Sequence, residues 1–187
     1  MNFNFAFIAL SVSATLFAGM ANATISGVTS AELTIKTQIT TGTCQATTQD
    51  GAGTTTSTVA FGDTFKSDLV NKTRVEPLTI KLTNCSGVSK ATVQAKPGSG
   101  GVCSGDSADG DSYSGGLNTG FEIWSGEVDS GVLMSCKTPP AAQEVTITSG
   151  AGQFPMKSRI VVAKGKTISD VGTGAVTAPV TFVVTYP

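Results

Sequence analysis

Histidine is absent from this chain of 187 residues, and charged side chains make up only 13% of it. Without histidine there is no Ser-His-Asp or Cys-His catalytic pair, no imidazole metal ligand and no imidazole pH switch. The formal net charge is -1, so the chain also lacks the basic surface that nucleic-acid binding requires. These absences argue against nucleic-acid binding and against the commonest catalytic groups, although an enzyme that works without histidine stays open.

Charge is also missing from the N-terminal part of the chain, where the first charged residue is Glu32. Residues 5–18 are mostly apolar, and Ala21-Asn22-Ala23 has the small-x-small pattern of a cleavage site. This combination predicts a secretory signal peptide over residues 1–23. A retained membrane anchor is the alternative. The apolar run is interrupted by Ser, Thr and Gly and is marginal for the about 20 residues that a span needs.

Cysteine occurs four times, as Cys44, Cys85, Cys103 and Cys136. An even number of cysteines in an exported chain predicts two disulfides. None of the spacings is C-x-x-C, which argues against a zinc site or a thioredoxin-like redox pair. Spacing alone leaves all three pairings open.

The chain is rich in residues that favour strands and turns. It contains 22 glycines, and threonine is more frequent than any charged residue type. Apolar and polar residues alternate with a period of two, which predicts strands with one buried face. Only residues 66–71 suggest a helical turn, and residues 49–56 and 97–118 are turn-rich. Seven or more short strands predict a single β-sandwich. The alternating runs are residues 33–39, 78–82, 91–95, 121–124, 145–147, 154–162 and 176–186.

Acidic residues offer little catalytic or metal-binding chemistry. Asp106, Asp109 and Asp111 follow the order D-x-x-D-G-D, which matches no EF-hand loop, so we expect a solvated loop rather than a calcium site. Glu122, beside Trp124, is the one candidate for an acid of glycoside hydrolysis, and it is expected to face solvent. Trp124 itself is expected to pack in the core. The sequence thus predicts no catalytic residue, no metal site and no cofactor.

Both ends of the chain after residue 23 alternate like strands. Chain termini usually fray, and a terminal strand with an apolar face must pair with another strand or become an aggregation hazard. The C-terminal run ends in Tyr186-Pro187, and Gly174, fourteenth from the end, precedes it. These two ends are the features that the composition leaves unexplained.

Four segments together resemble the structural subunits of chaperone–usher fimbriae, the bacterial pilins. Residues 34–44 resemble the first strand of that family, which ends in cysteine, and residues 78–85 resemble the strand that ends in the partner cysteine. Residues 120–126 resemble its middle strand and turn. The run after Gly174, with its penultimate tyrosine, resembles the signature that the chaperone recognises. The resemblance covers nearly all of the chain after residue 23.

This resemblance implies an all-β fold, an incomplete immunoglobulin-like sandwich of six strands that a donor strand from another chain completes. It implies a donor-strand extension over residues 24–36 and a pilin domain over residues 37–187. The expected partners are a periplasmic chaperone, an outer-membrane usher and neighbouring pilin subunits, which exchange strands by β-strand addition. The protein would be exported through the periplasm and would end in a fimbrium on the cell surface, supporting cell adhesion.

The resemblance also assigns individual residues. It implies the disulfide Cys44–Cys85, and with it a second pair, Cys103–Cys136, that is additional to the family's usual bond. This second pair would pin the long loop of residues 97–118. The residues expected at the groove edge, facing the chaperone, are Gly174, Val176, Val180, Phe182, Val184 and Tyr186. The residues expected on the donor strand are Ile25, Gly27, Thr29, Ala31, Leu33 and Ile35.

Two other function classes compete with the structural subunit. One is a single-domain tip or minor adhesin that binds a host receptor, whose identity the sequence does not give. Residues 24–187 leave no room for a separate lectin domain beside a sandwich of about 100 residues, and a donor-like extension argues against a position at the tip. The other is an exported enzyme, for which neither histidine nor a convincing pair of acids is present.

Overall fold

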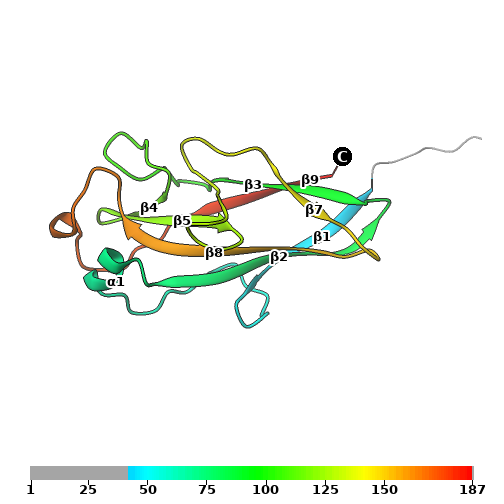
Figure 1. Cartoon of the computed structure of the whole chain (residues 1–187), viewed down its shortest axis with the longest axis horizontal. Coiled ribbons are helices and arrows are strands. Elements are labelled where there is room, and N and C mark those ends of the chain that lie inside the picture. Colours follow the sequence, from blue (N-terminus) through cyan, green and yellow to red (C-terminus); the bar gives the residue numbers. More distant parts are fainter. Residues whose placement is uncertain (1–41, 187) are drawn as a thin grey trace, which may run out of the picture. The chain divides into compact units, whose positions relative to one another are not determined.

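The computed structural model describes residues 42–186 as two antiparallel sheets that lie face to face (Figure 1). The predicted signal peptide, the donor-strand extension and its six named residues lie outside the described residues. Within residues 42–186 the helical elements are α1 (Lys66–Asn71) and a 3-10 turn, η1 (Ile168–Asp170). In this part of the chain no helix is long and apolar enough to cross a membrane. The all-β expectation is confirmed.

The larger sheet has the strand order β1-β2-β8-β5-β4, with β6 paired to β5. The smaller sheet has the order β7-β3-β9. Two of the edge strands matter for function, because β1 pairs only with β2 and β9 pairs only with β3 among the described strands. The strands are β1 (Thr43–Asp50), β2 (Val75–Ser86), β3 (Lys90–Pro97), β4 (Tyr113–Gly116), β5 (Thr119–Ser125), β6 (Val132–Leu133), β7 (Gln143–Thr146), β8 (Gly152–Val162) and β9 (Val180–Thr185).

The core lies between the inner faces of the two sheets. On β2, Leu78, Ile80 and Leu82 are buried and alternate with less buried polar residues, as a period of two requires. In the antiparallel pairing of β2 with β8, Leu78 lies opposite Met156 and Ile80 lies opposite Phe154, so all four side chains share the inner face. The smaller sheet contributes mainly short side chains, including the alanines and valine of β3.

Most of the predicted elements are confirmed, with two differences at the ends of strands. Strand β1 extends past Cys44 to Asp50, whereas the sequence predicted that the strand would end at Cys44; residues 34–41 of that predicted strand lie outside the described residues. The C-terminal strand begins at Val180 rather than at residue 176. The backbone N–H of Thr177 donates to the carbonyl of Gly115 (3.0 Å), so this part of the chain is bonded to β4 instead of β3.

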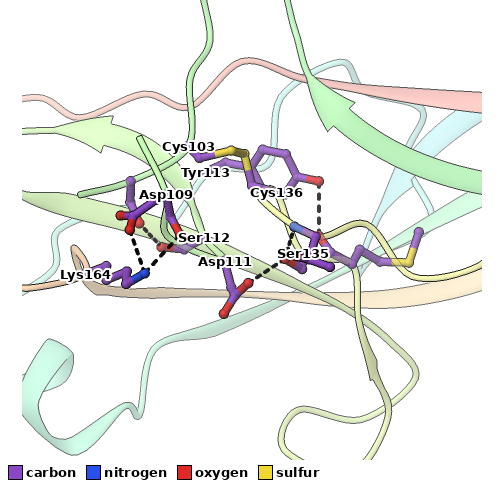
Figure 2. Close-up of a disulfide and its surroundings, with 11 residues drawn as sticks. Cys103, Asp109, Asp111, Ser112, Tyr113, Ser135, Cys136 and Lys164 are labelled. Carbon is purple, nitrogen blue, oxygen red and sulfur yellow. Dashed lines mark hydrogen bonds and ion pairs between the residues drawn. A yellow bond between two sulfur atoms is a disulfide. The ribbon is translucent and has the colours of Figure 1, made fainter. Parts of the chain in front are cut away.

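Both predicted disulfides are confirmed, and they lie in different parts of the sandwich. Cys44–Cys85 joins β1 to β2 across the edge of the larger sheet. Cys103–Cys136 joins the long loop after β3 to the segment after β6 (Figure 2). In the chain-entropy account each bond stabilises the folded state by about 4 kcal/mol, because each closes a loop of a few tens of residues.

The second disulfide belongs to a layered structure, which we call the ledge and define as residues 101–114 together with residues 133–138. Its backbone bonds run from Ser104 N–H to the Ser112 carbonyl (2.8 Å) and from Cys136 N–H to the Asp111 carbonyl (2.8 Å). The Tyr113 hydroxyl donates to the Met134 carbonyl (3.0 Å), and burial raises the pKa of Tyr113 to about 12. The backbone of this loop is therefore an ordered cover over the β4 edge, while Asp106 and Asp111 on it are exposed to solvent.

The outer face of the larger sheet differs from expectation. Glu122, expected to face solvent, lies directly opposite Arg159 on β8. Its carboxylate accepts a hydrogen bond from the Arg159 guanidinium (Nη2 to Oε2, 2.7 Å). Arg159, which the alternation of residues 154–162 places on the outer face, is 2% exposed because the loop after β5 covers it and Asp129 pairs with it (2.6 Å). Trp124 lies on this outer face and not in the core, with its indole N–H donating to Glu122 (3.1 Å). The guanidinium lowers the pKa of Asp129, and the two carboxylates raise that of Arg159.

Candidate subunit-binding groove

The groove lies between two strands that each have a partner strand on one side only, although residues 54–56 also bond to the last residues of β1. Strand β1 ends the larger sheet and β9 ends the smaller sheet, and the described residues contain no strand that joins them. Unpaired edges expose rows of N–H and C=O groups that another chain can pair with. Each layer of the sandwich thus has an edge strand on the groove side, β1 in the larger sheet and β9 in the smaller sheet.

Side chains of the core form the floor of this opening. The cavity volume is about 1510 Å³, which exceeds the usual range of small-molecule sites. Leu78 and Ile80 of β2, with Ile123 of β5, line it from the inner face of the larger sheet. Because these residues are also part of the main core, the groove reaches the centre of the sandwich.

Strand β9 supplies one wall, and its side chains alternate as the sequence predicted. Val180, Phe182 and Val184 are half-buried, pack against the core and line the groove. Of the residues between and beyond them, Thr181 and Thr185 are exposed and Val183 is half-buried, and Thr181 also borders the groove. A strand that lies beside β9 would therefore find apolar side chains at every second position, which suits an extended chain with its own period of two.

The opposite wall comes partly from a segment to which the sequence analysis gave no role. Residues 57–66 line the groove together with residues 46–48 of β1. Phe61 makes an edge-on contact with Phe121 of β5, with ring centroids 5.1 Å apart. The guanidinium of Arg74 donates to the Phe61 carbonyl (Nε to O, 2.8 Å) and holds this segment in place. The signal that could have revealed it is the alternation of Val59 and Phe61 with polar or small neighbours.

The six predicted groove-edge residues occupy related but unequal positions. Val176, Val180, Phe182 and Val184 line the groove, and so does Gly174. Gly174 has a φ of 139°, and a Cβ there would lie 3.2 Å from the Leu117 side chain, so the turn into this wall requires glycine. Tyr186 lies beyond the lining, where its hydroxyl donates to the Cys44 carbonyl (3.4 Å) and joins the two edges at one end.

Charge plays little part in the lining. Among the described residues that line the groove, only Asp63 and Lys66 carry charge, and both lie at the end near α1. The rest is apolar, hydroxyl or glycine. Such a groove can offer main-chain hydrogen bonds and apolar pockets but no acid–base or metal chemistry.

Comparison with known proteins shows to which family the chain belongs. No family model matches the chain. A curated protein of Escherichia coli (strain K12), the uncharacterized fimbrial-like protein YadL, is 35% identical over 167 residues, which cover 82% of this chain and 83% of the relative. The chain belongs to the family of fimbrial subunits. Proteins of this family are exported to the cell surface as parts of fimbriae, and they are structural proteins rather than enzymes.

Solved structures agree on the fold. The P pilus rod subunit PapA is 20% identical, with a TM-score of 0.53, over 77% of this chain and 99% of PapA. A subunit from a chaperone–usher pilus whose structure concerns rod uncoiling is 19% identical, with a TM-score of 0.51, over 84% of this chain and 96% of its own. At these identities the likeness establishes the pilin fold and nothing finer. The expectation of an incomplete immunoglobulin-like sandwich is confirmed.

Proposed function

We propose that the chain is a structural subunit that polymerises into a fimbrium by donor-strand exchange. A periplasmic chaperone inserts a strand between β1 and β9, and at the usher the extension of the next subunit replaces that strand. The observation that carries the proposal is the groove itself, about 1510 Å³ in volume and lined by alternate side chains of β9. The family membership supports it independently.

The donor strand in this proposal is residues 24–36 of a second copy. Its alternating residues are Ile25, Gly27, Thr29, Ala31, Leu33 and Ile35, and the segment contains no proline, so every residue can donate a backbone N–H. One groove and one donor segment in the same chain favour a subunit inside the polymer over a tip adhesin. A one-residue slip would turn the apolar face outward, so the register must be defined by the pockets.

The test of the groove compares two positions on β9. Phe182→Asp places a charge in the groove, whereas Thr185→Asp places the same charge on an exposed residue of the same strand that does not line the groove. We expect Phe182→Asp to abolish co-purification with the chaperone and Thr185→Asp to retain it. Equal co-purification of both variants with the chaperone contradicts the proposal for the groove.

The test of the donor segment uses purified chaperone–subunit complexes. Leu33→Asp, or deletion of residues 24–30, should leave chaperone binding intact and stop the variant from entering a neighbour's groove. Polymer formation is followed as a ladder of detergent-resistant bands over time, with wild-type complexes as acceptors. If the altered subunit extends the polymer at the wild-type rate, residues 24–36 are not the donor strand.

A further inference from the structure

A second hollow lies on the outer face of the larger sheet, between α1 and the ledge. Its cavity volume is about 480 Å³, within the range of small-molecule sites. Val161 of β8 and Glu122 of β5 contribute to its lining, and Leu69 is the one residue that also lines the groove. We call this hollow the outer cleft. It opens on the face opposite the donor strand, so a filled groove leaves it accessible.

The outer cleft is lined by charges of both signs. Lys72 and Lys164 line it, and so do Asp111 and Glu122. Lys164 is paired with Asp109 (2.8 Å) and Glu122 with Arg159 (2.7 Å). The two remaining charges of the lining, on Lys72 and Asp111, are of opposite sign, so the lining as a whole favours neither an anion nor a cation as its ligand.

Some hydrogen-bonding capacity remains after these pairs are counted. Asp111 accepts the hydroxyl of Ser135 on one carboxylate oxygen (2.6 Å), and its second oxygen has no partner within residues 42–186. Lys72 likewise forms no ion pair in the described part of the chain. Figure 2 shows the Asp111 carboxylate pointing away from the Cys103–Cys136 disulfide. The cleft thus holds an available acceptor and an available donor of hydrogen bonds.

Two buried serines add a second donor. Ser104 and Ser112 are 1% and 6% exposed, both line the cleft, and their hydroxyl oxygens are 2.7 Å apart. Only one of the two hydroxyl protons can lie in that bond. Within the described residues no acceptor takes the other proton, although a buried hydroxyl normally has one. A ligand oxygen in the cleft would satisfy it.

Apolar surface completes the arrangement. Leu69, Val70 and Val161 line the same cleft as the polar groups. A ligand that suits it is uncharged, carries several hydroxyls that both donate and accept, and has an apolar face of C–H groups. A pyranose ring has all three properties, and one or two rings match the volume.

We propose that the outer cleft binds a neutral saccharide of one or two rings, with Asp111 accepting from ring hydroxyls and Lys72 and the serine pair donating to them. The site does not depend on the donor strand, so each subunit of a polymer would present one copy. A fimbrium built from this chain would then bind glycans weakly at each site and strongly through many sites.

Saturation-transfer NMR tests this proposal. The sample is the chain purified from the periplasm in complex with the chaperone. The probes are the methyl glycosides of galactose, mannose, glucose and N-acetylglucosamine, with sialic acid as an anionic control and spermidine as a cationic control. We expect transfer to at least one neutral glycoside. Asp111→Asn and Lys72→Gln should each weaken its binding about tenfold, the effect of losing one charge-assisted hydrogen bond.

Lys90→Gln is the matched control, because Lys90 pairs with Glu144 on the smaller sheet, away from the cleft, and should leave binding unchanged. Circular dichroism and chaperone co-purification verify that each variant is folded. The proposal is overturned if folded wild-type protein shows no transfer to any neutral glycoside, or shows it only for sialic acid or spermidine. It is equally overturned if binding survives both cleft substitutions at wild-type strength.

Discussion

The two edges of the larger sheet differ, because another segment covers one of them and not the other. At the β4 end, the ledge covers the edge with backbone hydrogen bonds and fixes itself with the Cys103–Cys136 disulfide. At the β1 end, the edge faces the groove, and across that groove β9 is equally unpaired. An edge strand has a row of backbone N–H and C=O groups without partners in its sheet. The ledge satisfies such groups on β4, whereas no named strand within the described residues pairs with the outer side of β1.

This contrast limits where the larger sheet can add a strand. If both of its edges were open, a subunit could pair with another chain at either one, and a linear polymer would branch or aggregate. Covering the β4 edge leaves β1 as the open end of that sheet within the described residues. The following substitutions act on one edge or the other, and their effects should separate accordingly.

The largest expected effect comes from the covered edge. Replacing both Cys103 and Cys136 by Ser should reduce the free energy of unfolding by about 4 kcal/mol, because the unfolded chain is then no longer constrained by a closed loop. Chaperone binding through β9 should persist at low temperature, since the groove is on the other side. Thermal unfolding followed by circular dichroism, beside chaperone co-purification, measures the two effects separately. Loss of chaperone binding at a temperature where the variant is folded would show that the edges are coupled.

Arg159 is the next strongest test, because its charge is buried on the central strand β8. Arg159→Met leaves Glu122 without its partner under the loop after β5 and should cost about 3 kcal/mol, the lower end for breaking a buried pair. Asp129→Asn should cost less, because that carboxylate is largely exposed. Chemical denaturation of both variants gives the ranking, and a larger cost for Asp129→Asn contradicts this account.

Tyr186 tests the open side at its end. Tyr186→Ser removes the apolar ring that packs against the core and the hydroxyl that donates to Cys44, at a cost of about 1.5–3 kcal/mol of apolar burial. Because the lost contacts join the two groove edges, we expect weaker chaperone binding and periplasmic degradation of the subunit. Steady-state levels and chaperone co-purification, with Thr185→Ser as the exposed neighbour control, check this expectation.

The smallest effect concerns Tyr113 in the ledge, whose pKa burial raises from 10 to about 12. The folded state therefore favours the neutral phenol, and this contribution is complete below pH 10 and is lost as pH rises from about 10 to about 12. Tyr113→Phe removes one hydrogen bond at a cost of about 1 kcal/mol and should abolish this part of the alkaline destabilisation. Absorbance of the phenolate should show a step near pH 12 in the wild type that is missing from the variant.

Much of the open side could be predicted from the sequence. The alternation of Val180, Phe182 and Val184 predicted that these side chains share one side of a strand, and all three line the groove, while their contact with a chaperone stays a prediction. Leu78, Ile80 and Leu82 were likewise identifiable as one face of a core strand. The resemblance to pilins supplied the disulfide pairing, and the structure confirms both bonds. The roles of the donor residues stay predictions.

The covered side could not be predicted in the same way. Alternation placed Glu122 and Arg159 on an outer face, but it could not tell that a loop would bury that face and pair the two charges. The wall formed by residues 57–66 was missed because its position depends on Phe61 contacting Phe121, sixty residues away in the sequence. The outer cleft combines side chains from α1, the ledge, β5 and β8, which only the folded chain brings together.

By itself, the sequence determined the all-β character of this protein, the buried face of each main strand and the likeness of its C-terminal strand to a chaperone-recognition segment. These are local properties, set by the period of two and by turn-forming residues. Only the tertiary structure decided which strand edges stay open and which outer faces are covered. Those outcomes depend on contacts between segments far apart in the chain, such as Cys103 with Cys136 and Glu122 with Arg159, and local patterns carry no information about them.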